Sequence, residues 1–163
     1  MTEDVEHTPD GHHIVVNGRK WRATDLSIPE NLRAELVSEL MRARRAVGRR
    51  GDEASPCVRD AKVALGERGE PWWEEASDKG VRARLAATIR TLLRHRDGKS
   101  ICPSDAARVV GGAQWRDVLP VVREVAHELV TQQVVVVTQK GAQIDVQEAR
   151  GPIRIAPGAE LHR

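Results

Sequence analysis

Phenylalanine and tyrosine are absent from this 163-residue chain, so its four tryptophans are the main source of aromatic surface. Proteins that bind single-stranded nucleic acids usually stack bases on several exposed aromatic rings, and this class is disfavoured. Long apolar runs are also absent. The longest, Val134 to Val137, is far shorter than the roughly 20 residues that a membrane helix needs. The two cysteines are too few for a disulfide framework and fit a reducing compartment.

The common signatures of targeting, catalysis and metal binding are missing as well. The N-terminal segment MTEDVEH is acidic and has no apolar stretch, so we expect a cytoplasmic protein without a membrane partner. The sequence has no P-loop, G-x-G-x-x-G, G-x-S-x-G or H-E-x-x-H motif, and we expect neither an enzyme nor a cofactor. The neighbouring His12 and His13 would point to opposite faces of a strand, so we expect no metal site there.

Charge is distributed unevenly along the chain, although the net charge is only +2. Residues 1–78 carry a net charge of −4 and residues 79–163 a net charge of +6, which indicates two modules with a boundary near residues 74–80. The densest basic cluster of the first half comprises Arg42, Arg44, Arg45, Arg49 and Arg50. These cations either complement the dipole at a helix C-terminus or contact phosphates.

The first module is predicted at residues 12–75, after a disordered tail at 1–11. Asn17-Gly18 lies between two β-favouring runs and predicts a β-hairpin. Apolar residues at 3.6-residue spacing, including Leu32, Leu36 and Leu40, predict a first helix, and Ser55-Pro56 begins a second. We expect the apolar segment around Trp72-Trp73 to dock on the second module.

The second module is predicted at residues 79–156, before a tail at 157–163. Its expected elements are a helix to about His95, a short extended segment, a helix from Pro103 to Val110 and a helix from near Trp115. A strand at 134–139 then turns at Lys140-Gly141, and a last strand covers 151–155. This order is typical of a winged helix-turn-helix domain. The chain as a whole is predicted to be α+β and mostly helical.

Four segments also resemble one known family. They are Ile101-Cys102-Pro103-Ser104-Asp105-Ala106-Ala107-Arg108, Trp115-Arg116, Gln139-Lys140-Gly141 and Arg150-Gly151-Pro152-Ile153-Arg154. In this register they resemble the bacterial domain-of-unknown-function 3253 family over about residues 82–155. The first module looks like the N-terminal extension of actinobacterial members. The resemblance implies a winged-helix-like fold in a small cytoplasmic protein, and it implies no activity and no functional residue.

The predicted third helix complicates a DNA-binding function, because Arg116 and Arg123 are outnumbered by Asp117, Glu124 and Glu128. We therefore expect weak electrostatic contacts to double-stranded DNA by a transcription-associated or chromosome-associated protein, mainly through the first helix and its turn. The candidate nucleic-acid-binding residues are Arg90, Arg94, Arg96, Lys99, Arg108, Arg116, Arg123 and Lys140. The alternative is a protein-protein interaction module without nucleic acid, with Trp115 or Trp72-Trp73 as anchors. The oligomeric state stays open.

Cys102 has two interpretations, because it occupies the predicted N-cap of the second helix of this module. Peptide N–H groups at a helix start stabilise a thiolate, which would suit redox sensing. A small, largely buried cysteine at a strand-to-helix corner is the structural alternative.

Overall fold

The computed structural model describes residues 5–50 and 55–162, and it begins with a small antiparallel sheet. Strands β1 (Glu6–His7), β2 (His13–Val16) and β3 (Arg19–Arg22) lie in the order β1-β2-β3. Asn17 and Gly18 connect β2 to β3 with φ angles of 52° and 76°. A two-residue hairpin turn of this kind needs positive φ at both positions, and the predicted hairpin is confirmed.

Two helices complete the first half of the chain. Helix α1 (Glu30–Arg50) buries Leu32, Leu36 and Leu40 on one face, as their spacing predicts. Helix α2 (Ser55–Ala64) packs on α1 and on the next helix, α3 (Asp78–Arg96). The side chain of Ser77 caps α3 by accepting a hydrogen bond from the Gly80 N–H.

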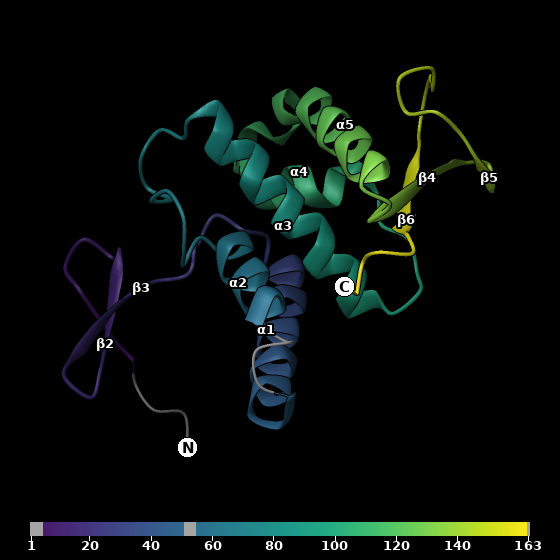
Figure 1. Ribbon diagram of the computed structural model, residues 1–163. Coiled ribbons are helices and arrows are strands. Elements are labelled where there is room, and N and C mark those ends of the chain that lie inside the picture. Colours follow the sequence, from purple (N-terminus) through teal and green to yellow (C-terminus); the bar gives the residue numbers. More distant parts are fainter. Residues whose placement is uncertain (1–4, 51–54, 163) are drawn as a thin grey trace.

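The second half continues with helices and ends in another small sheet. Helix α4 (Pro103–Gly111), the 3-10 turn η2 (Gly112–Gln114) and helix α5 (Trp115–Thr131) follow α3. Strands β4 (Val135–Gln139), β5 (Ala142–Gln143) and β6 (Arg154–Pro157) then form an antiparallel sheet in the order β5-β4-β6. Ile101, between α3 and α4, forms a bridge to Ile155 of β6. The predicted α+β class with mostly helical content is confirmed, and the two sheets lie on opposite sides of the helices (Figure 1).

Helix α3 joins the two halves, because its buried side chains belong to one continuous apolar core. Leu85, Ile89, Leu92 and Leu93 of α3 are fully buried, and this core extends from Leu32 of α1 to the second sheet. Helices α1 and α2 pack on α3, so the two halves meet over a wider surface than the segment around Trp72 that the sequence predicts.

Both predicted tails differ from expectation. Residues 5–11 include β1, which pairs with Ile14 and Val15 of β2, so the described part of the N-terminal tail is ordered by backbone hydrogen bonds. At the other end, Leu161 is 1% exposed and its carbonyl accepts a hydrogen bond from Arg94. The short terminal segment is therefore part of the core. Among the described residues, no helix is both long and apolar enough to span a membrane.

Candidate nucleic-acid interface

Two of the arginines predicted to contact phosphates are engaged inside the protein. Arg90 donates to both carboxylate oxygens of Asp60 in α2, at 2.9 and 3.0 Å, and Arg94 donates to Asp60 at 2.7 Å. Burial raises the pKa of Asp60, but the two guanidinium groups outweigh burial and the pKa is lowered overall. Arg94 is only 5% exposed. These two arginines hold α3 to α2, and Arg94 is buried away from a phosphate backbone.

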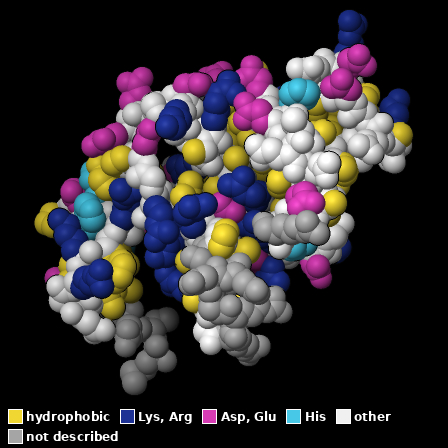
Figure 2. Space-filling model, viewed as in Figure 1, with side chains coloured by type: hydrophobic (Ala, Val, Ile, Leu, Met, Phe, Trp, Pro, Cys, Tyr) yellow, Lys and Arg dark blue, Asp and Glu magenta, His cyan; other side chains and the backbone are white. Residues whose placement is uncertain are grey.

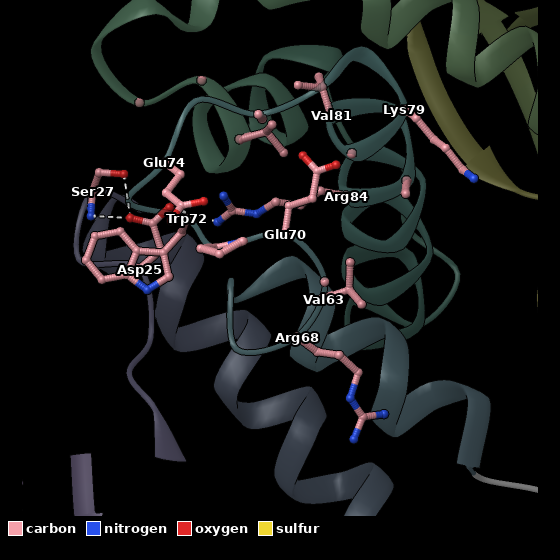
Figure 3. Close-up of a pocket in the computed structure, with 18 of the residues that line it drawn as sticks. Asp25, Ser27, Val63, Arg68, Glu70, Trp72, Glu74, Lys79, Val81 and Arg84 are labelled. Atoms are coloured by element: carbon pink, nitrogen blue, oxygen red, sulfur yellow. Dashed lines mark hydrogen bonds and ion pairs between the residues drawn. The ribbon is translucent and has the colours of Figure 1, made fainter. Parts of the chain in front are cut away.

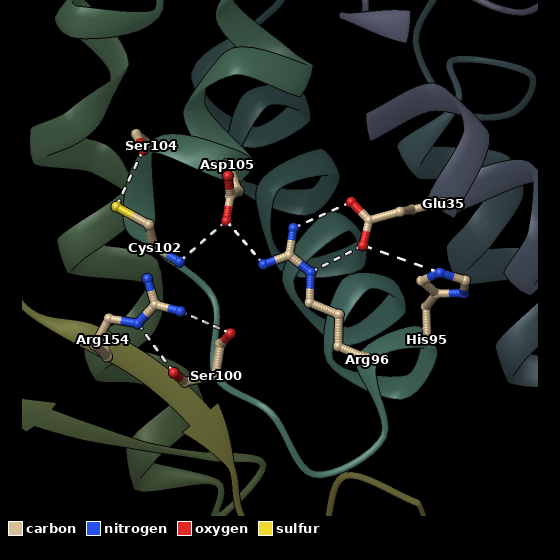
Figure 4. Close-up of polar contacts among 8 residues, drawn as sticks. All are labelled: Glu35, His95, Arg96, Ser100, Cys102, Ser104, Asp105 and Arg154. Atoms are coloured by element: carbon tan, nitrogen blue, oxygen red, sulfur yellow. Dashed lines mark hydrogen bonds and ion pairs between the residues drawn. The ribbon is translucent and has the colours of Figure 1, made fainter. Parts of the chain in front are cut away.

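Arg96 is also engaged, and Figure 4 shows it between two carboxylates from different helices. It donates two hydrogen bonds to Glu35 of α1, at 2.9 and 3.1 Å, and a third to Asp105 of α4 at 3.1 Å. The bond to Glu35 is the main reason why the pKa of Arg96 is raised. Asp105 also accepts from the backbone N–H of Cys102 at the start of α4. Arg96 therefore connects α1, α3 and α4.

Arg123 on α5 holds the loop between β5 and β6. Its guanidinium donates to the carbonyl oxygens of Ala149 at 3.1 Å and Gly151 at 2.6 Å. Gln139 of β4 holds the same loop by donating to the carbonyls of Arg150 and Pro152. The loop that connects β5 to β6 is therefore held from one side by α5 and from the other by β4.

The acidic face of α5 is partly neutralised by an arginine that the prediction did not consider. Arg82 on α3 forms an ion pair with Glu124, lies 3.7 Å from Glu128 and donates to Asp78 at 3.0 Å. Hydrogen bonds to Glu124 and Asp78 raise the pKa of Arg82. Glu124 and Glu128 therefore repel DNA phosphates less than two unpaired carboxylates would. Arg82 is itself engaged in these pairs and is not a free cation for DNA.

The other four predicted residues are exposed. Arg108 and Arg116 lie on the ring of Trp115, with guanidinium carbons 4.6 and 4.4 Å from its centre. Trp115 itself is half-buried against the core, so it fills space between helices more than it offers an anchor. Lys99 lies in the turn between α3 and α4, and Lys140 lies in the turn between β4 and β5 with a φ of 51°.

Lys140 belongs to a cationic cleft of about 480 Å³ beside β4 and β6. We call it the β4–β6 cleft, and its lining residues are Gln139, Lys140, Arg150, Pro152, Ile153 and Arg154. Of these described residues, three are cations and none is a carboxylate. Arg154 donates through Nε and Nη2 to the hydroxyl and carbonyl of Ser100, both at 2.9 Å, which fixes its direction (Figure 4).

The prediction missed Arg150 and Arg154. Both lie in the segment Arg150-Gly151-Pro152-Ile153-Arg154, which had been singled out as a motif. Their position in that motif, close in sequence to the turn at Lys140-Gly141, was the signal that could have identified them. The acidic residues of the preceding loop do not oppose them directly, because neither Asp145 nor Glu148 lines the cleft.

A larger cavity of about 610 Å³ lies where the two halves of the chain meet. Figure 3 shows Asp25, Ser27 and Trp72 on one side of it and Arg84 reaching toward them from α3. Asp25 accepts from Arg84 at 2.9 Å and from the hydroxyl of Ser27 at 2.7 Å. The charges of Asp25 and Arg84 in this cavity therefore pair with each other. This ion pair joins the two halves of the chain.

The remaining candidates from the sequence also have contacts within the protein. His12 stacks on Trp73 with ring centres 4.1 Å apart, and Trp72 contacts Trp73 edge to face, so these tryptophans pack within the first half. The described residues contain no group of three or more His, Cys, Asp or Glu side chains that could hold a metal ion. Cys102 is the N-cap of α4, as predicted, and its sulfur accepts from the Ser104 hydroxyl at 3.0 Å.

A family profile matches the second half of the chain. The profile of the family described as "Protein of unknown function (DUF3253)" matches residues 82–157. This segment runs from Arg82, at the start of the second turn of α3, to the end of β6 and contains the whole β4–β6 cleft. No curated protein matches the chain.

Proposed function

Because residues 82–157 belong to the DUF3253 family, we propose that they form a winged helix-turn-helix domain that binds the phosphate backbone of double-stranded DNA. The protein would then act in transcription or on the chromosome. The β4–β6 cleft is the contact surface in this proposal, and its cationic lining is the observation that carries it.

The order of elements supports the winged-helix part of the proposal. Helices α4 and α5 are separated only by the short turn η2, and the β4–β5 hairpin follows α5 directly. Strand β6 returns to pair with β4, and Ile101 adds a bridge on the other side of β6. In this arrangement α5 is the third helix and the hairpin with its cleft is the wing.

The three cations of the cleft are suited to phosphate oxygens. Lys140 and Arg150 are exposed, so binding a phosphate costs them little desolvation. Arg154 donates hydrogen bonds from Nε and Nη2 to Ser100, so the orientation of its guanidinium group is set before a ligand binds. Lys99, exposed next to Ser100, extends the positive surface from this side.

The described contacts of α5 support binding without strong sequence preference. Arg123 donates to two backbone carbonyls, and Glu124 and Glu128 face Arg82, so these three side chains are not directed at base edges. Recognition that depends on phosphates carries no direct sequence information. We therefore expect similar affinities for duplexes of different sequence.

Fluorescence anisotropy with a short labelled duplex at low salt tests the proposal. The double substitution Lys140→Ala/Arg150→Ala should weaken binding by roughly tenfold or more, because it removes two phosphate contacts. The matched control is Arg33→Ala/Lys79→Ala, which removes two cations outside the cleft and should change the affinity by less than about twofold.

The proposal fails if the unmodified protein does not bind the duplex at low salt, or if both double variants weaken binding equally. Absence of binding would favour the alternative, a protein-protein interaction module.

A further inference from the structure

A second group of cations lies in the first half of the chain, outside the matched family segment. Figure 2 shows Lys and Arg side chains gathered between the first sheet and helices α1 and α2. The indole of Trp21, on β3, is 41% exposed. The Arg19 guanidinium lies 4.2 Å from its ring centre and the Lys62 ammonium 5.8 Å. Arg19, Trp21, Arg44, Lys62 and Arg68 are called the Trp21 patch below.

The cations of the Trp21 patch act on one another. Burial, followed by the positive charges of Arg44 and Arg68, lowers the pKa of Lys62. Glu67 acts on Lys62 in the opposite direction, and burial raises the pKa of Glu67 itself. Arg44 and Lys62 thus both act on the carboxylate of Glu67, and Arg68 adds a third positive charge near Lys62. Such crowded positive charge is relieved when an anion binds.

Hydrogen bonds connect the backbone segments next to the patch. Arg22 of β3 donates to the Gly69 carbonyl at 2.8 Å, and the indole N–H of Trp72 donates to the Ala23 carbonyl at 3.0 Å. The Asp25 N–H donates to the Leu65 carbonyl at 2.9 Å. These bonds connect β3 and the segment after it with the end of α2 and the turn beyond. Because the backbone there is already fixed, binding has to order only the side chains of the patch.

The Trp21 patch and the β4–β6 cleft lie on separate parts of the molecule, because the patch residues belong to β3, α1, α2 and the turn after α2. In Figure 1, β2 and β3 are on one side, β4 to β6 are on the other, and α3, α4 and α5 lie between them. Double-stranded DNA is stiff over the dimensions of a small protein, with a persistence length of about 150 base pairs. A straight duplex in the cleft reaches the patch only where the two surfaces lie in one line on the same face, whereas two separate duplexes meet no such constraint.

From this placement we infer that the Trp21 patch binds the phosphates of a second DNA duplex, so that one molecule bridges two duplex segments. The inference rests on the proposed function of the β4–β6 cleft. Its own support is the cluster of cations on β3, α1, α2 and the turn after α2, which can contact several phosphates along a backbone. The exposed indole adds a flat surface beside the cations.

A two-duplex capture assay tests the inference with the full chain. One duplex is immobilised on beads, the protein is added, and retention of a second, fluorescent duplex is measured. Arg44→Ala/Arg68→Ala should reduce retention at least tenfold, while anisotropy still detects binding of a single duplex through the cleft. Arg33→Ala/Lys79→Ala is the matched control, because neither residue belongs to the patch or the cleft.

The outcomes separate the inference from the proposed function. If the unmodified protein binds one duplex but retains no second duplex, the inference is wrong and the proposed function stands. If Arg44→Ala/Arg68→Ala retains as much second duplex as the unmodified protein, bridging has another origin, such as dimerisation, and the inference is also wrong. Loss of bridging in this variant alone, with the control unchanged and both variants folded, supports it.

Discussion

A single buried carboxylate, Asp60, decides the role of two arginines. In the sequence, Arg90 and Arg94 are cations on an amphipathic helix and are free to contact phosphates. In the folded protein both donate to Asp60, 30 and 34 residues away on α2. A cation that is hydrogen-bonded to a buried carboxylate is a structural residue, because removing it from its partner is costly.

Asp60→Asn should lower the free energy of unfolding at pH 7 by about 3–5 kcal/mol, because Arg94 remains buried without its counter-charge. The folded-state pKa of Asp60 is lowered, so its stabilisation is present above the unfolded value of about 3.9 and is lost as pH falls through the folded pKa. Urea unfolding at several pH values should show the difference between the two proteins shrinking in acid.

The control for this prediction is Asp117→Asn, at an exposed position of α5, which should change stability by less than about 0.5 kcal/mol. A difference between Asp60→Asn and the unmodified protein that stays constant down to strongly acidic pH would contradict the assignment of the ion pairs.

At the scale of elements, the helices and the two hairpins follow from local patterns, whereas the segments at both ends do not. Periodic leucines define α1, Pro103 begins α4, and Asn17-Gly18 and Lys140-Gly141 define the two turns. The residues after β6 have no such pattern. They are ordered by partners distant in sequence, since Gly158 donates to the Val134 carbonyl and Leu161 enters the core.

Leu161→Ala tests this role of the C-terminal segment. Truncating a side chain that is 1% exposed should lower the free energy of unfolding by about 2–5 kcal/mol. His162→Ala, at the exposed neighbouring position, should have little effect. Both changes are measured by chemical denaturation, and equal stabilities of the two variants would mean that the segment does not pack on the core.

For the molecule as a whole, local sequence signals predicted the class of fold and the order of elements, but not which cations remain available. Availability depends on pairs such as Asp60 with Arg90 and Glu35 with Arg96, which form only when distant helices pack. Lys140 could be predicted to be an available cation because it lies in a hairpin turn, and turn residues are usually exposed. Arg150 and Arg154 were missed because their cleft forms only when β6 pairs with β4.

We propose that the β4–β6 cleft binds DNA phosphates, and the salt dependence of duplex binding is a direct measure of such contacts. Each phosphate neutralised contributes about −0.9 to the slope of log K against log salt. The unmodified protein should therefore show a steep negative slope, and Lys140→Ala/Arg150→Ala should flatten it by about 1.8 while Arg33→Ala/Lys79→Ala leaves it unchanged. Failure to bind duplex DNA at low salt, or an unchanged slope in the cleft variant, would contradict the claim.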